Sequence, residues 1–155
     1  MNLKMTPLSS LKEALTLASI RNQCRHLLTN DQQEISQLQQ IHWFEHIYTQ
    51  QNPQYYWVWL LKESNENIIG YFAAKEAKEG IYITEGILED KRGAGAGTFM
   101  LNFMLCREVL RKKPIYADIF EYNYASLRLH KKFGFTEHSR INEQITRFCF
   151  MDASC

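Results

Sequence analysis

The sequence predicts a single mixed α/β domain that spans residues 1–155. A chain of 155 residues has the usual length of one domain and can bury a core without disulfides or a metal. Hydrophobic residues amount to 45% and charged residues to 23%, which excludes a largely disordered chain. Helical patterns come first, a run of strand patterns follows, and strands then alternate with helices. This order is typical of a sheet that packs against helices.

Composition and cysteine spacing exclude several classes of function. The chain has 18 Lys and Arg against 17 Asp and Glu, so it lacks the basic excess of nucleic-acid binders. No apolar run approaches the ~18 residues that span a membrane, and the first residues lack the apolar core of a signal peptide. The four cysteines form no Cys-x-x-Cys pair, and Cys106 lies in an apolar stretch where we expect a core residue. We therefore expect a cytoplasmic protein with reduced thiols and no nucleic-acid or membrane partner.

The first half reads as one strand, two helices and three strands. Ser9 or Ser10, and later Ser36, are candidate N-caps, because a serine oxygen can accept from a free N–H of the first helical turn. The run from Gln54 to Leu61 is aromatic and β-branched, which favours a strand, and the polar turn after it predicts a hairpin. The expected bounds are a strand over 3–5, helices that end near 21 and 48, and strands over 54–61, 68–74 and 81–88.

The second half alternates helices and strands. Residues 98–110 are strongly apolar and too many for a typical strand, so we expect a mostly buried helix. Pro114 precedes a strand over 115–120. Asn123 begins a helix that Gly134 ends. Two strands near 136–140 and 144–150 are expected to complete the sheet.

The most informative segment is Arg92–Thr98, R-G-A-G-A-G-T, which follows a strand and opens a helix. Small residues let an anion approach backbone N–H groups, and the helix dipole favours negative charge there. Arg92 adds a cation, so the segment predicts a phosphate or pyrophosphate site. It is no P-loop, because no Lys precedes Thr98, and neither glycine register gives Gly-x-Gly-x-x-Gly. A tight turn without a ligand stays open as the alternative.

The segment Asn123–Phe135 is the second signal. At about 100° per residue, Asn123, Ser126 and His130 share one helical face. Asn123 can cap the helix, and its amide can also donate a hydrogen bond to a ligand. An ordinary amphipathic helix with an Asn cap is the alternative for this segment taken alone.

Together the two segments resemble the GNAT superfamily of acetyl-CoA-dependent N-acetyltransferases. Arg92-x-x-Gly95-x-Gly97 is similar to the pyrophosphate-binding signature of that family, and Asn123-x-x-Ser126, continued to Gly134-Phe135, is similar to its later motif. The resemblance covers roughly residues 68–135. It implies a central, mostly antiparallel sheet of about six to seven strands with about four helices and splayed central strands. It also implies direct acetyl transfer from acetyl-CoA to a primary amine: a small amine, an amino sugar, or a protein N-terminus or lysine.

The resemblance further implies a binding mode for acetyl-CoA. Pantetheine would lie between the splayed strands and pair with backbone groups of one of them. The glycine-rich loop would hold the pyrophosphate, and the start of the Asn123 helix would contact the pantetheine arm. No metal is implied. The residues expected to bind acetyl-CoA are Ile87, Leu88, Arg92, Gly93, Ala94, Gly95, Ala96, Gly97, Thr98, Asn123 and Ser126.

Two residues are candidates for catalysis. Glu85 lies two residues before Ile87 on the same strand face, and we expect it to take the amine proton directly or through water. An N–H of this strand would stabilise the oxyanion. His130 stands where the family usually has a tyrosine acid, and we expect it to protonate the leaving thiolate, with Tyr122 or Tyr124 as substitutes. The same departure leaves open a non-catalytic CoA-binding regulatory domain.

Two further patterns have simpler interpretations. His42-x-x-Glu45-His46 matches an inverted zincin motif, but no third ligand is evident, so we expect an amphipathic helix with exposed histidines. The aromatic run over 55–59 is expected to be a core strand rather than a surface that stacks bases. Dimerisation is common among similar proteins, so the resemblance allows a homodimer, although no residue pattern indicates one.

Overall fold

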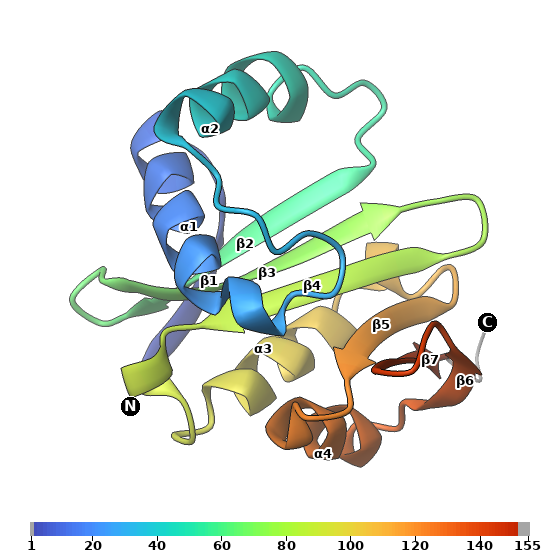
Figure 1. Cartoon of the computed structure of the whole chain (residues 1–155). Helices are drawn as coiled ribbons and strands as arrows, with labels where there is room; N and C mark the ends of the chain where they lie inside the picture. Colours follow the sequence, from blue (N-terminus) through green and yellow to red (C-terminus); the bar gives the residue numbers. More distant parts are fainter. Residues whose placement is uncertain (1, 152–155) are drawn as a thin grey trace.

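The structure, a computed structural model, describes residues 2–151 and contains one seven-stranded sheet with helices on both faces (Figure 1). The strand order is β1-β2-β3-β4-β5-β7-β6, and β4 and β5 form the single parallel pair in an otherwise antiparallel sheet. The strands are β1 (Leu3–Pro7), β2 (Tyr56–Glu63), β3 (Ile68–Glu76), β4 (Ile81–Ile87), β5 (Ile115–Phe120), β6 (Thr136–Arg140) and β7 (Ile145–Phe150). The helices are α1 (Leu11–Cys24), α2 (Gln37–Trp43), α3 (Ala96–Leu105) and α4 (Tyr124–Lys132). The predicted mixed α/β class is confirmed.

Serine caps start the two N-terminal helices. The Ser10 hydroxyl accepts a hydrogen bond from the Glu13 N–H at 3.1 Å. Ser36 and Gln39 form a reciprocal capping box, in which each side chain accepts from the backbone N–H of the other residue. Such caps satisfy N–H groups that the first helical turn leaves free. Helix α2 continues through a π-helical turn that ends at Tyr48, where the sequence predicted the helix to end.

The sheet separates two hydrophobic cores. Helices α1 and α2 cover one face, and α3 and α4 cover the other (Figure 1). Strand residues alternate between these faces, so that Leu60 and Tyr71 belong to the α1 core, whereas Leu61 and Phe72 belong to the α3 core. In the part of the chain that the structure describes, no helix is both long and apolar enough to cross a membrane.

The segment after α3 differs from the prediction. The helix ends at Leu105, five residues before the expected end at Leu110, and a short 3-10 turn over Glu108–Leu110 follows. Leu110 is still buried, so the apolar residues after Leu105 indicate burial but do not indicate a helix. Cys106 lies just past the helix and is exposed, so its expected place in the core is wrong.

Candidate functional site

Strands β4 and β5 pair through two residue couples, Ile81 with Ile115 and Tyr82 with Tyr116, and then diverge. A cavity of about 630 Å³ lies along the diverging strands, and we call it the large cavity. Its walls come from β4, β5, the glycine-rich loop, the first turns of α4 and the C-terminal end of α1. All but two of the predicted site residues line it, namely Glu85, Ile87, Arg92, Gly93, Gly95, Ala96, Gly97, Thr98, Asn123, Ser126 and His130.

The two predicted residues outside this lining are Leu88 and Ala94. The backbone of Leu88 is already paired: its N–H donates to the Ile69 carbonyl at 2.9 Å, and its carbonyl accepts from the Lys91 N–H at 2.9 Å. These contacts turn the backbone of Leu88 away from the diverging strands. Ala94 lies on the outside of the glycine-rich loop and is exposed.

Backbone groups of β4 face the gap at every second residue. The Ile81 N–H donates to the Pro114 carbonyl, at the point where the gap begins, on the β5 side of the strand. Because hydrogen-bonding directions alternate along a strand, the backbone groups of Glu85 and Ile87 point to the same side. There β5 has diverged, so the Glu85 backbone and the Ile87 N–H face the gap, whereas the Ile87 carbonyl already accepts from Arg92.

The glycine-rich loop is shaped by backbone conformations that side chains disfavour. Gly93 and Gly95 have φ of 79° and 87°, in the left-handed region that glycine adopts readily. A Cβ on Gly97 would lie 2.7 Å from the Leu129 side chain, so glycine here lets α3 approach α4. Gly95 caps α3 without a side chain, which leaves the first-turn N–H groups available to an anion.

Arg92 links the loop to the end of α1. Its Nε donates to the Ile87 carbonyl at 3.0 Å, and its Nη2 lies 3.7 Å from the Cys24 Sγ. A guanidinium carries five N–H donors, so these contacts leave others for an anion at the loop. Cys24 is buried and lines the large cavity, a position that no sequence pattern predicts, because Cys24 lies 63 residues before Ile87.

The two predicted catalytic residues contact each other. Strand β4 and helix α4 bring the Glu85 Oε1 to 2.9 Å from the His130 Nε2. The other ring nitrogen, Nδ1, lies 2.8 Å from the Ser126 carbonyl, one helical turn earlier. The His130 side chain is 2% exposed and that of Glu85 is 18% exposed, so the pair is largely withdrawn from solvent.

The partners of both ring nitrogens bear on the charge of His130. Its Nε2 faces the Glu85 carboxylate, and its Nδ1 lies 2.8 Å from the Ser126 carbonyl and 3.2 Å from the Ser126 hydroxyl. Burial lowers the pKa of His130, but the charge and hydrogen bond of Glu85 and the Ser126 carbonyl outweigh burial and hold that pKa above its ordinary value. The Glu85 Oε2 is buried and has no hydrogen-bond partner among residues 2–151, so it is the one acceptor of the pair that a ligand could use.

The tyrosines considered as substitute acids have other contacts or face outward. The Tyr122 hydroxyl donates to the His26 carbonyl at 2.9 Å, which fastens the segment after α1 to the end of β5. Tyr124 is 66% exposed. Both residues line the rim of the large cavity, whereas the Glu85–His130 pair is buried.

The zincin-like pattern has no metal-site geometry around it. His42 and His46 lie with ring centroids 4.9 Å apart on α2 and its π-helical extension. Within residues 2–151, no three His, Cys, Asp or Glu side chains are grouped so that they could hold a metal ion. In the aromatic run of β2, Val58 and Trp59 are buried, which confirms the predicted core strand.

Comparisons with known proteins agree with this architecture. The sequence profile described as the acetyltransferase (GNAT) family matches residues 17–135. No protein with a curated description matches the sequence significantly. A protein of Acinetobacter baylyi ADP1 described as an acetyltransferase has a similar structure, with a TM-score of 0.80, 18% identity and coverage of 97% of this chain and 92% of that one.

Two further structures have similar folds and hold ligands. One is a Salmonella typhimurium protein described as an acetyltransferase with its cofactor acetyl-CoA (TM-score 0.73, 17% identity, 96% of this chain and 93% of that chain). The other is spermidine N-acetyltransferase from Vibrio cholerae in complex with CoA and spermine (TM-score 0.71, 17% identity, 96% and 94%). At these identities the structures show a shared fold, and the family rests on the sequence profile.

Proposed function

The chain belongs to the GNAT acetyltransferase family, and on that premise we propose that it moves an acetyl group from acetyl-CoA to a primary amine by direct attack. The observation that carries the proposal is the Glu85–His130 pair, which lines the same cavity as the glycine-rich loop. An anion-binding loop, an open strand edge and a buried proton-transfer pair in one cavity are the parts that acyl transfer from a phosphate-bearing thioester needs.

The residues of the large cavity fit acetyl-CoA. The uncapped first turn of α3 and the Arg92 guanidinium offer donors for the pyrophosphate. The gap edge of β4 at Ile87 and the amide of Asn123 offer hydrogen bonds to the pantetheine arm. When bound there, acetyl-CoA supplies the activated thioester. The backbone N–H of Ile87 would then donate to the carbonyl oxygen on which negative charge develops.

Glu85 and His130 act as one proton-transfer unit in this proposal. The nitrogen of a free amine forms the new bond to the acetyl carbon, the carbon–sulfur bond breaks, and one proton must move from nitrogen to sulfur. The open Glu85 Oε2 accepts the amine proton, and the pair returns one proton to the thiolate. The pair thus ends the reaction with the protons it had at the start. His130 supplies the acid in this proposal, at the position where the family resemblance implies a tyrosine.

Turnover assays with matched variants test this proposal. Thiol release from acetyl-CoA should depend on a primary amine, and Glu85→Gln should lower kcat by about 10²–10⁴-fold, the usual contribution of acid–base catalysis. Glu137→Gln and His46→Gln change exposed residues of the same types and should keep full activity. If His130→Ala kept full turnover while His130→Tyr gave no gain, His130 would have no role as an acid. Binding of acetyl-CoA without turnover of any amine would contradict the catalytic proposal.

A further inference from the structure

Residues 25–29 cross from β4 to β5 on the α1 side of the gap, and we call them the strap. Arg25–Leu27 form a short 3-10 turn after α1, and Leu27, Leu28 and Thr29 line the large cavity. In Figure 1 this segment is the blue ribbon that runs from the end of α1 across β4 before the chain turns back to α2. The strap is therefore one wall of the site where acetyl transfer is proposed.

The strap is rooted beside β4 at Cys24, the last residue of α1. The Cys24 thiol donates to the Ile87 carbonyl at 3.5 Å, and the Arg92 Nε donates to the same carbonyl at 3.0 Å. Cys24 is buried, so this end of the strap has a fixed position above the end of β4. Any movement of the strap must therefore occur at its other end.

The other end of the strap rests on β5 and on the turn that follows it. The Tyr122 hydroxyl donates to the His26 carbonyl at 2.9 Å, and the Thr29 hydroxyl donates to the Asp118 carbonyl at 3.5 Å. The Tyr122 ring stacks on that of Phe120, with the ring centroids 4.8 Å apart. Two hydrogen bonds, one of them long, thus fasten the strap to the β5 side, so it belongs to the segments that open at low cost.

Leu28 plugs the gap from the α1 side. It is 5% exposed and lines the large cavity, yet among the described residues it belongs to neither of the two hydrophobic cores. Arg25 and His26, which precede it in the strap, are exposed. The burial of Leu28 therefore comes from its place over the gap and depends on the strap being held down.

The fastened end of the strap is coupled to a residue that we expect to hold acetyl-CoA. Asn123 directly follows Tyr122, and its N–H donates to the Phe120 carbonyl at 3.0 Å. Its side chain caps α4 by accepting from the Ser126 N–H at 3.3 Å and lines the large cavity. The contact of the strap with Tyr122 thus steadies the turn that presents Asn123. By linkage, a ligand that binds Asn123 in this position also favours the fastened strap.

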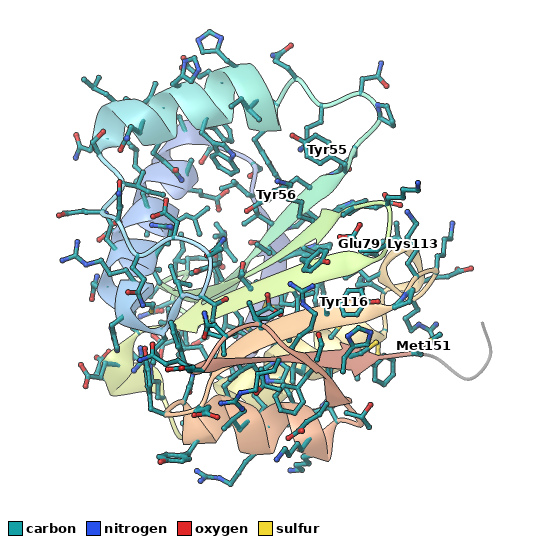
Figure 2. All side chains as sticks on the ribbon, turned by 45° about the vertical axis from the view of Figure 1, so that its right-hand side comes forward. Tyr55, Tyr56, Glu79, Lys113, Tyr116 and Met151 are labelled. Atoms are coloured by element: carbon teal, nitrogen blue, oxygen red, sulfur yellow. The ribbon has the colours of Figure 1, made fainter. Side chains whose placement is uncertain are left out.

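The strap covers only one end of the gap. Further along the same face of the sheet, Tyr82 of β4 and Tyr116 of β5 have ring centroids 5.3 Å apart. Figure 2 shows Tyr116 on a part of the sheet that neither α1 nor α2 covers. An amine can therefore approach the gap beside the strap while Leu28 stays in place.

We propose that residues 25–29 are a strap that acetyl-CoA fastens over the gap, and that Leu28 then keeps water away from the thioester on the α1 side. This inference rests on the proposed acetyltransferase function. Hydrolysis is the side reaction that the strap suppresses. In it the oxygen of a water molecule would bond to the acetyl carbon and the carbon–sulfur bond would break. Acetic acid and the CoA thiol would result, with one water proton on each.

Hydrogen exchange measures the fastening directly. In the wild type, the amides of residues 25–29 should exchange about tenfold more slowly at saturating acetyl-CoA than without it, the size of a typical coupling between two sites. Tyr122→Phe removes the hydroxyl that holds the strap and should abolish most of this slowing. Tyr55→Phe is the matched control and should keep it, because Tyr55 is 40% exposed and lies outside the lining of the large cavity. Unchanged or faster exchange in the wild type, or equal slowing in Tyr122→Phe, would overturn the inference.

Thiol release without an amine tests the shield against water. Leu28→Ala shortens the side chain over the gap and should raise the amine-independent release of thiol from bound acetyl-CoA severalfold. Leu28→Val is a milder change that should give a smaller rise and keeps the test open if the alanine variant does not fold. Leu38→Ala is the matched control, because Leu38 of α2 is 79% exposed and lies outside the lining of the large cavity. An unchanged rate in a Leu28 variant that melts like a folded protein would contradict the role of Leu28.

Calorimetry with acetyl-CoA separates this inference from the proposed function. If acetyl-CoA does not bind, both fail. Binding that leaves the exchange of the strap unchanged contradicts the strap alone. Slower exchange of the strap without turnover of any amine supports the strap and contradicts the proposed catalysis.

Discussion

The large cavity and a second cavity of about 280 Å³, which α1, α2, β2 and β3 enclose, adjoin along β3 and β4 but are built in different ways. The large cavity takes its polar surface mainly from backbone: the open edge of β4, the glycine-rich loop and the first turn of α3. The second cavity takes its polar surface from the side chains of Arg21, Gln40, Tyr56 and Tyr71, which come from four different elements. Backbone groups are present whatever the sequence, whereas a surface made of converging side chains changes with each substitution.

The two cavities also differ in what their charged groups can do. In the large cavity, Glu85 and His130 lie within hydrogen-bond distance, and the buried Glu85 Oε2 has no hydrogen-bond partner among residues 2–151. In the second cavity, Arg21 donates to the Gln33 and Asp31 carbonyls and lies 4.0 Å from the Asp31 carboxylate, and burial raises the pKa of Tyr56 and Tyr71, so both hydroxyls keep their protons at neutral pH. The groups of the large cavity therefore suit proton transfer, whereas the tyrosines of the second cavity keep their protons at neutral pH. Four changes test this difference between the cavities. They are described in order from the largest expected effect to the smallest.

The largest effect is expected from the proton-transfer pair. Glu85→Gln and the double variant Glu85→Gln with His130→Gln should lower kcat by a similar factor, about 10²–10⁴, because residues that act as one unit are not additive. Single-turnover measurements with each variant and the double variant check this. Losses that multiply would show that the two side chains work independently.

The next largest effect is expected from a larger side chain in the glycine-rich loop. Gly97→Val would drive a side chain into Leu129, where a Cβ alone lies 2.7 Å from it, and should weaken acetyl-CoA binding by tenfold or more, about 1.4 kcal/mol. Gly93→Ala is the control, because a Cβ there meets nothing within 4 Å and adds only the strain of a φ of 79°. The dissociation constants of acetyl-CoA for both variants, measured by calorimetry, test this expectation. Equal weakening by the two substitutions would mean that backbone strain, and not the approach of α3 to α4, sets affinity.

The pKa of His130 makes stability depend on pH. Its pKa in the folded protein is raised above the value of ~6.5 expected when unfolded, so the folded state holds the proton more tightly. The resulting stabilisation is fully present below about pH 6.5 and is lost as pH rises through the raised pKa. His130→Gln should therefore lower the melting temperature more at pH 6 than at pH 9. A difference that is the same at both pH values would contradict the imidazolium assigned to His130.

The smallest effect is expected at the rim. Tyr122→Phe removes the hydrogen bond to the His26 carbonyl, about 1 kcal/mol, and loosens the segment after α1 that lies beside the large cavity. KM for the acceptor should rise a fewfold with kcat unchanged. A large fall in kcat would instead give the Tyr122 hydroxyl a direct role as an acid.

Local features of the site could be predicted from sequence. Gly95 and Asn123 fulfil their roles through the backbone beside them, one in a left-handed turn and the other as a helix cap, so short motifs reveal them. Glu85 and His130 were predicted singly, but their contact joins β4 to α4 across 45 residues, and no local pattern reports it. Cys106 was wrongly predicted to lie in the core for a different reason. The run of apolar residues continues past Leu105, where α3 ends.

The second cavity could not be predicted from the sequence for the same physical reason. Arg21, Gln40 and Tyr71 meet because α1 and α2 pack against each other over the sheet, and each alone is an ordinary residue of a helix or strand. The family resemblance predicted that β4 and β5 diverge. The cross-strand pairing of Tyr71 with Gly86 depends on the register of β3 and β4, which no short motif indicates.

Titration of acetyl-CoA into the wild-type protein, Arg92→Ala and Tyr71→Phe, followed by calorimetry, tests the division between the cavities most directly. We predict one binding site in the wild type, binding weakened about tenfold or more in Arg92→Ala by the loss of a charge-assisted contact, and unchanged binding in Tyr71→Phe. No binding at millimolar acetyl-CoA, or equal weakening in both variants, would contradict the account.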